Sequence, residues 1–339
     1  MDLEFTEEQD LLRETVRGVC ARHCGLDVVR SLEDDPVGYP EKLWLQLVEL
    51  GLLDPELTML DKAIVYQEFG RALAPSPHFA SAVMSAGALT RAGRTPSSDA
   101  IIVPAWLEPD RGFGPKGVTA RIDDGRLSGV KRHVPFASSA DQLLVLTRDG
   151  LALVDRHAEG VTITQQKSIA SDAQYRVDFD GARAEVVVDD YWPIWHDAML
   201  DGIILLAAQA VGGARYALDI TVQYAKDRFQ FDKPLGAFQA IAHYLSDAVT
   251  ALDGAELLVW EAAWARTEGR SIARLAPMAK LFACTTYRDI TAMAQQVFGG
   301  VGFTVEYDIQ LYFRRAKQLQ ISWWDDRYLE ELIATEVLD

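Results

Sequence analysis

Cysteine is scarce in this 339-residue sequence, with three residues in the whole chain. So few cysteines exclude a disulfide framework of the kind that stabilises secreted proteins. The opening residues Met1 to Glu4 also lack the basic and apolar regions of a secretory signal. We therefore expect a cytoplasmic protein.

Basic residues are outnumbered, with 33 Lys and Arg against 50 Asp and Glu and a formal charge of −17. This sign opposes attraction to phosphate backbones and to anionic membranes. Long apolar runs are missing too, because the stretch from Ile203 to Val211 is interrupted by Gln209 and is shorter than the roughly 20 residues that cross a bilayer. We expect neither a nucleic-acid partner nor a membrane span.

Familiar hydrolase and metal motifs are also lacking, since the histidines are scattered singly and form no Ser-His-Asp or zinc pattern. Cys20, His23 and Cys24 lie on one predicted helix at a spacing that could seat a metal, but no second cluster of ligands joins them. We interpret the two cysteines as buried core residues and expect no metal site.

Helical patterns fill the first part of the chain, residues 1–97, which we interpret as an N-terminal α-helical domain. The first helix has a predicted capping box at Thr6 and Gln9. Further helical periods cover residues 40–52, 59–73 and 77–92.

Short β-prone runs characterise the middle part, residues 98–192. They cover residues 101–106, 118–122, 142–147, 151–154 and 161–164, separated by turn pairs such as Asp124-Gly125. This spacing predicts a small antiparallel β-barrel or, alternatively, a sandwich.

The helical period returns over residues 193–339 and predicts a C-terminal four-helix bundle, so the whole chain is an α+β multidomain protein. The expected helices cover residues 195–226, 237–268, 274–297 and 325–337. Gly212 and Gly213 lie inside the first of them, where glycine is unfavourable, so we expect a close helix approach or a cofactor at that point.

A cluster of candidate binding residues runs from Arg228 to Gln239, between the first two helices of the bundle. An arginine suits a pyrophosphate because its planar fork forms paired charge-assisted bonds, and Phe231 and Phe238 could flank an adenine. The alternative is a helical hairpin whose arginine caps carbonyls and whose phenylalanines belong to the core.

A second cluster runs from Gln296 to Thr304 at the end of a long helix. Gly299 or Gly300 could simply terminate that helix. Alternatively, the glycines allow a ligand to touch the backbone beside the amide of Gln296.

Taken together, the two clusters resemble the flavin-dependent acyl-CoA dehydrogenase family, and the resemblance covers nearly the whole chain. It implies FAD as cofactor and a dimeric or tetrameric assembly, in which these segments reach a neighbouring subunit's flavin. The roles implied for FAD binding fall on Arg228, Gln230, Phe231, Phe238, Gln239, Gln296, Gly299 and Gly300.

The middle domain departs from the family pattern at the segments that hold the flavin ring. A Thr-Glu-Pro segment is replaced by residues 107–109 (Leu-Glu-Pro), a Gly-Ser-Asp turn by residues 112–115, and a Trp-Ile-Thr segment by His133-Val134-Pro135. Donors that would polarise the flavin are therefore lost or altered, and proline has no backbone N–H.

The catalytic base is also missing from its usual places. The family chemistry needs a positioned carboxylate to remove a proton, yet the two positions where relatives carry glutamate hold Gly202 and Trp323. Asp325 and Asp201 are the nearby candidates. Asp325, like Asp326, could equally be the N-cap of the final helix.

With these losses, the chain resembles the companion subunit of bacterial heterotetrameric acyl-CoA dehydrogenases of steroid side-chain degradation. That resemblance implies a catalytic partner subunit in an α2β2 complex, an acyl-CoA or steroid-CoA substrate and, as acceptor, electron-transferring flavoprotein. A short bridge at Asp54-Pro55-Glu56, where the family has a longer loop, agrees with an incomplete substrate pocket.

Two alternatives remain open at this level: a self-sufficient homomeric dehydrogenase with an aspartate base, and a binding or scaffold protein without redox chemistry. The tryptophans are similarly ambiguous, because rigid aromatic faces could line an acyl or steroid cavity or belong to the core and interfaces. They are Trp260, Trp264, Trp323 and Trp324.

Overall fold

The computed structural model describes residues 5–54, 57–96 and 100–338. Their contacts group the chain into two compact units. The first, the helical unit, comprises residues up to 26, 58–74 and 203–339, and the second, the mixed unit, comprises residues 27–57 and 75–202. Because residues 55–56 are outside the described part, the expected short bridge at Asp54-Pro55-Glu56 is not described.

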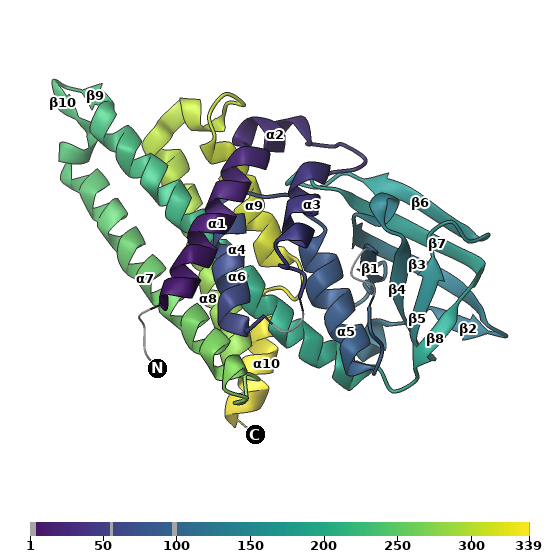
Figure 1. Cartoon of the computed structure of the whole chain (residues 1–339). Helices are drawn as coiled ribbons and strands as arrows, with labels where there is room; N and C mark the ends of the chain where they lie inside the picture. Colours follow the sequence, from purple (N-terminus) through teal and green to yellow (C-terminus); the bar gives the residue numbers. More distant parts are fainter. Residues whose placement is uncertain (1–4, 55–56, 97–99, 339) are drawn as a thin grey trace. The chain divides into compact units, whose positions relative to one another are not determined.

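The helical unit is built from long helices of the C-terminal region and two helices from the N-terminal region (Figure 1). They are α1 (Glu7–His23), α4 (Met59–Ala72), α6 (Trp192–Asp227), α7 (Gln239–Thr267), α8 (Leu275–Phe298), α9 (Ile309–Ile321) and α10 (Asp326–Leu338). Helix α6 starts in the mixed unit and enters the helical unit after Gly202.

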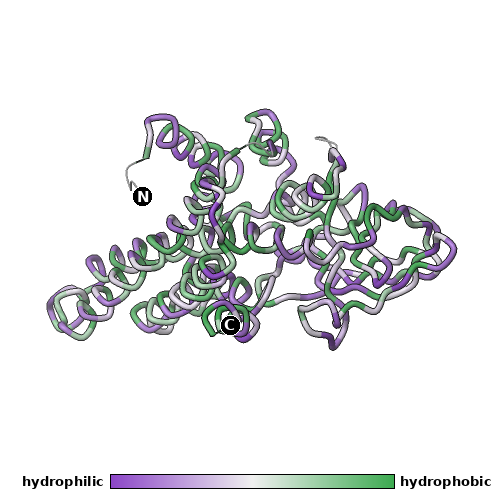
Figure 2. The backbone as a smooth tube through the Cα atoms, turned by 90° about the horizontal axis from the view of Figure 1, so that it is seen from below, coloured by the Kyte–Doolittle hydropathy of each residue, from purple (hydrophilic) through white to green (hydrophobic). Residues whose placement is uncertain are grey.

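Helix α1 has the predicted capping box, since the hydroxyl of Thr6 accepts from the N–H of Gln9 at 3.2 Å and the Gln9 side chain accepts from the N–H of Thr6. Around the turns of the long helices, apolar and polar positions alternate (Figure 2), which is the pattern of helices that bury one face. By length and composition alone α6 could cross a membrane, but 72% of its most apolar window is buried inside the protein, as expected of a core helix.

Helices α4 and α6 cross at two glycines. A β carbon on Gly212 would lie 1.9 Å from the carbonyl oxygen of Gln67, and one on Gly70 would lie 1.9 Å from the carbonyl oxygen of Gln209. Any side chain at either position would force the helices apart. The close helix approach predicted at Gly212 is confirmed.

The mixed unit contains two four-stranded sheets and several short helices (Figure 1). The helices are α2 (Leu26–Ser31), α3 (Glu41–Glu49), a π-helix (Phe79–Ser85) and α5 (Ala86–Arg91). The strands are β1 (Ile102–Ala105), β2 (Arg121–Asp123), β3 (Arg126–Pro135), β4 (Gln142–Thr147), β5 (Gly150–Asp155), β6 (Val161–Gln166), β7 (Gln174–Arg183) and β8 (Glu185–Val188).

The sheets have the strand orders β1-β4-β5-β8 and β2-β3-β7-β6. Apolar residues from both sheets, including Val103, Leu127, Leu143 and Val177, form one buried core. The predicted order of helices, strands and helices is confirmed. The predicted closed barrel is not formed, because the described strands make two separate sheets that share one core. The expectation of antiparallel pairing is also wrong for β1, which pairs parallel with β4, as a crossover connection allows.

Candidate functional site

The cluster from Arg228 to Gln239 forms a small hairpin at the junction of α6 and α7 (Figure 1). Strand β9 (Phe229–Gln230) pairs antiparallel with β10 (Lys233–Pro234), and the N–H of Leu235 donates to the carbonyl of Arg228 at 2.8 Å. The turn residues Phe231 and Asp232 have positive φ values of 53° and 62°. This backbone fixes where the arginine and the aromatic rings are presented.

The hairpin side chains face outward. Phe231 is 86% exposed, and Arg228, Gln230 and Gln239 are exposed as well. Phe238 contacts two neighbours in the hairpin. The Phe231 ring meets the Phe238 ring edge-on with centroids 6.2 Å apart, and the ammonium of Lys233 lies 4.1 Å from the centroid of the Phe238 ring. Core residues would be buried, but Phe231 is exposed and Phe238 is only half-buried. The alternative in which both phenylalanines belong to the core is therefore wrong.

The second cluster follows α8 directly. Gln296 is exposed, and β carbons on Gly299 and Gly300 would meet nothing within 4 Å. Gly299 also ends the helix with φ +66°, so termination and open access coincide at this residue. The third glycine has a packing role, because a β carbon on Gly302 would lie 2.6 Å from the side-chain oxygen of the buried Gln295.

A stack of aromatic rings joins the two clusters. Tyr224, one turn before Arg228, stacks on Phe298 with centroids 4.2 Å apart, and Tyr307 meets both rings edge-on. The Tyr224 hydroxyl donates to the carbonyl of Phe298 at 3.4 Å. The structure thus brings together segments separated by about 70 residues of sequence. Tyr224 and Phe298 lie within or one helical turn before the two clusters, and this spacing could have identified their rings from the sequence.

Gly202, the first of the two positions at which the resemblance implies a base, lies in α6 against the π-helix. A β carbon there would be 2.6 Å from the sulfur of Met84 and 3.2 Å from the ring of Phe79. The site is therefore filled by side chains of this chain, and a glutamate would displace them.

The second position, Trp323, lies in a strained turn between α9 and α10. Trp323 and Trp324 have φ values of 53° and 73°, which cost free energy for residues with a β carbon. The fully buried ammonium of Lys280 holds this turn by donating to the carbonyls of Leu319 at 3.2 Å, Ser322 at 2.9 Å and Trp324 at 2.7 Å. Burial lowers the pKa of Lys280.

The candidate aspartates have structural partners. The carboxylate of Asp325 accepts from the N–H of Tyr328 at 3.0 Å, which is the N-cap interaction of α10. Asp201 pairs with Arg91, whose other side binds Asp197, at distances of 2.5 and 2.7 Å. Cap and base were the two interpretations of Asp325, and the observed hydrogen bond is the one expected of a helix cap.

Residues 107–109, one of the segments of the mixed unit that depart from the expected family pattern, contribute Glu108 to a buried ion pair. Lys131 Nζ donates to Glu108 at 2.7 Å, and the N–H groups of Thr119 and Ala120 donate to the same carboxylate. Burial opposes ionisation of Glu108, but attraction by Lys131 and these hydrogen bonds outweigh it and lower its pKa. Burial lowers the pKa of Lys131 to about 8.

Close to this pair, Phe113 stacks on Trp106 at 5.8 Å, and Trp106 also meets the buried Trp195 at 5.8 Å. An aromatic side chain therefore occupies the middle of the 112–114 segment, where the family has a serine. Elsewhere, Cys20 and Cys24 are buried, in agreement with a core role.

Comparison with known proteins identifies matching families and structures. Residues 6–95 match the family model for the N-terminal domain of acyl-CoA dehydrogenases, and residues 192–337 match the model for the C-terminal domain. Among curated relatives, the acyl-CoA dehydrogenase IpdE2 of Mycobacterium tuberculosis is 31% identical over 91% of this chain and 91% of its own length.

Two solved structures are similar along nearly their whole length. The ChsE4-ChsE5 complex from Mycobacterium tuberculosis contains a chain with a TM-score of 0.88 and 25% identity, covering 100% of this chain and 99% of that one. The Tcur3481-Tcur3483 steroid ACAD, in a G363A variant, contains one with a TM-score of 0.86 and 28% identity, covering 98% and 99%.

Proposed function

This chain belongs to the acyl-CoA dehydrogenase family, and we propose that it is the companion subunit of a heteromeric enzyme, completing the flavin site of a catalytic partner without supplying a base. The reaction proposed for the complex is α,β-desaturation of a CoA thioester. Removal of the α proton falls to a carboxylate of the partner subunit.

FAD is the cofactor of this family, and the exposed half of the site fits it. The hairpin presents an arginine fork, suited to a pyrophosphate, beside two aromatic rings, and Gly299 and Gly300 leave open space beside Gln296. When bound, FAD accepts the hydride from the β carbon of the thioester. Arg228, Gln230, Gln239 and Gln296 would bind its polar groups, and Phe231 and Phe238 would flank its adenine.

The observation that carries the proposal is the contrast between this open surface and the positions of the base. Gly202 is covered by Met84 and Phe79, and Trp323 has no group that accepts a proton. In the mixed unit, Phe113 and Pro135 replace residues that would donate to the flavin ring. Residues that would serve a neighbour are kept, and those that would serve this subunit are lost.

The relatives support the finer parts of the proposal. One structural neighbour is described as a complex of two different chains and another as a steroid ACAD. We therefore propose an α2β2 complex, a steroid-CoA or other acyl-CoA substrate, electron-transferring flavoprotein as acceptor and a cytoplasmic location.

The deciding experiment is to measure flavin absorbance per chain for this protein purified alone and after co-expression with a catalytic acyl-CoA dehydrogenase encoded beside its gene. Flavin and a heteromeric mass that appear only with the partner are expected. A stable homomer of this chain with full flavin and dehydrogenase turnover would contradict the proposal.

Within the complex, Arg228→Gln is expected to weaken flavin retention, because the paired bonds to a pyrophosphate are lost. Lys226→Gln, at the end of the same helix, is the matched control and should leave the flavin in place. If flavin content is equal in both variants, Arg228 does not contact the cofactor.

The second candidate is a self-sufficient enzyme with an aspartate base. Asp201 supports this candidate because it is adjacent to Gly202 in sequence and its side chain is 15% exposed. Asp201→Asn and Asp325→Asn separate the two possibilities. Turnover unchanged by either substitution removes the second candidate, whereas a loss of several orders of magnitude at unchanged folding would establish it.

A further inference from the structure

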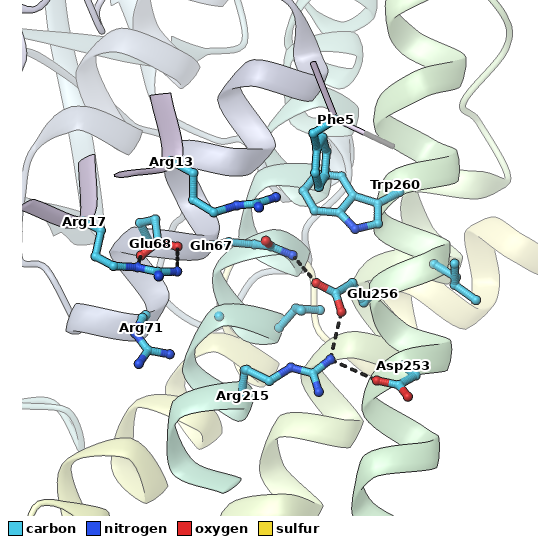
Figure 3. A pocket seen from close by; sticks show the side chains of 13 residues that line it. Phe5, Arg13, Arg17, Gln67, Glu68, Arg71, Arg215, Asp253, Glu256 and Trp260 are labelled. Atoms are coloured by element: carbon cyan, nitrogen blue, oxygen red, sulfur yellow. Dashed lines mark hydrogen bonds and ion pairs between the residues drawn. The ribbon is translucent and has the colours of Figure 1, made fainter. Parts of the chain in front are cut away.

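A cavity of about 540 Å³ lies within the helical unit, between α1, α4, α6 and α7 (Figure 3). Its volume is in the range of small-molecule sites. The α7 residues that line it begin at Asp253, 14 residues after Gln239, which places them about 20 Å along the helix from the hairpin at a rise of 1.5 Å per residue. The cavity is therefore separate from the surface proposed to bind FAD.

Four arginines and three carboxylates line this cavity. Arg17 binds both oxygens of Glu68 at 2.9 and 2.7 Å. Arg215 binds Asp253 at 2.9 Å and Glu256 at 2.8 Å. Arg17 and Arg215 thus pair with all three lining carboxylates, and this group of five side chains has a formal charge of −1.

The two other lining arginines, Arg13 and Arg71, form ion pairs with carboxylates outside the cavity. Their carboxylate partners, Asp10 at 3.1 Å and Asp219 at 3.4 Å, do not line the cavity and have side chains 58% and 52% exposed. Ion pairs of that kind are weak because water screens them. Among the described residues, the four lining arginines and three lining carboxylates have a formal net charge of +1.

The wall beside Arg13 is apolar. The guanidinium of Arg13 is 4.4 Å from the ring centroid of Phe5, which meets Trp260 edge-on at 4.9 Å. In Figure 3 the Arg13 guanidinium extends over Gln67 toward these two rings. Leu257, which is 48% exposed, also lines the cavity.

We propose that this cavity binds a small carboxylate carried on an apolar ring or chain. Arg13 contacts the carboxylate through charge-assisted hydrogen bonds, and Trp260, Leu257 and Val211 contact the apolar body. Arg71 adds to the local positive potential. A neutral molecule of the same shape lacks the first interaction and binds more weakly.

The test is calorimetric titration of the full chain with 1-adamantanecarboxylate and with the uncharged 1-adamantanecarboxamide, whose shape is nearly the same. Saturable binding of the carboxylate is expected, with at least ten-fold weaker binding of the carboxamide, because hydrogen bonds between ionised groups are the stronger ones. Equal affinity for the two probes, or no saturable binding of the carboxylate, would overturn the proposal.

Substitutions locate the site. Arg13→Gln should weaken carboxylate binding at least ten-fold and Arg71→Gln a few-fold, whereas Arg22→Gln, in the last turn of the same α1 helix, should change nothing. Leu257→Asp adds a negative charge to an exposed part of the wall and should abolish binding even if Arg13→Gln disturbs folding. Binding unaffected by Arg13→Gln and by Leu257→Asp would show that the probe binds elsewhere. Flavin content of the complex with the partner is expected to remain unchanged in all these variants, which separates this test from that of the proposed function.

Discussion

Gly202 and Met84 are in contact at the point where α6 meets the π-helix, such that a β carbon on Gly202 would lie 2.6 Å from the Met84 sulfur. The family resemblance of the sequence implies a catalytic carboxylate at this position or at Trp323. Here the space contains a thioether and the ring of Phe79. A side chain larger than glycine at position 202 would therefore require Met84 and Phe79 to move.

Gly202→Ala is expected to destabilise the protein by about 1–2 kcal/mol, because the added methyl group displaces Met84 and Phe79 from a packed position. Unfolding in urea measures the effect. Gly18→Ala is the matched control: a β carbon at this position in α1 would meet nothing within 4 Å, and the substitution should stabilise by about 0.5–1 kcal/mol through helix propensity. Stabilisation by both substitutions would mean that the space at Gly202 is open.

Lys280→Met should destabilise the protein by about 3 kcal/mol and loosen the turn from Ser322 to Asp325. The ammonium makes three hydrogen bonds to carbonyls at the end of α9, and methionine of similar length makes none. Urea unfolding gives the stability, and limited proteolysis reports on the turn. Lys317→Met, which removes one bond to Gln320 on the same part of α9, is the control with an expected loss below about 1 kcal/mol. Equal losses for the two variants would mean that Lys280 does not support the turn.

Glu108→Gln should cost about 3–5 kcal/mol at neutral pH, because it leaves the buried Lys131 without its charged partner. The pKa of Glu108 is lowered below its ordinary value of 4.5 in the folded protein. The carboxylate therefore contributes its full stability above pH 4.5 and loses that contribution as the pH falls through its folded pKa.

The measurement for Glu108 is urea unfolding of both proteins from pH 7 to pH 3. The difference between wild type and Glu108→Gln should be constant above about pH 5 and shrink below 4.5. Glu185→Gln, in an exposed pair with Arg94, should cost less than about 1 kcal/mol at any pH. A difference for Glu108→Gln that is independent of pH would refute the ionised pair.

Tyr224→Ala is expected to lower flavin retention in the complex about ten-fold, because the stack on Phe298 connects the hairpin to the Gly299-Gly300 turn. Tyr224→Phe retains the stack and gives up only a long 3.4 Å hydrogen bond, so its flavin content should stay close to wild type. Flavin content after dilution and gel filtration measures both. If the two variants behave alike, the hydroxyl rather than the stack joins the segments.

The sequence by itself determined the succession of elements and the identity of the exposed binding segments. The capping box at Thr6 and the period of the long helices are local properties, so spacing was enough to predict α1, α6, α7 and α8 within a few residues. Helix α9 and strands β3, β7 and β8 were missed. The register of β3 shifts between Lys131 and Val134, so its form depends on pairing. Strand β7 could have been predicted, because buried apolar and polar residues alternate regularly from Tyr175 to Phe179.

Only the tertiary structure decided what surrounds the positions of the base. The hydrogen bond from the N–H of Tyr328 to the carboxylate of Asp325 identifies Asp325 as a helix cap, and it is visible only in the structure. The same is true of the contact between Gly202 and Met84. The ion pairs that Arg17 and Arg215 form in the cavity likewise join residues of separate helices. Contacts of this kind join residues far apart in sequence, and no local pattern encodes them.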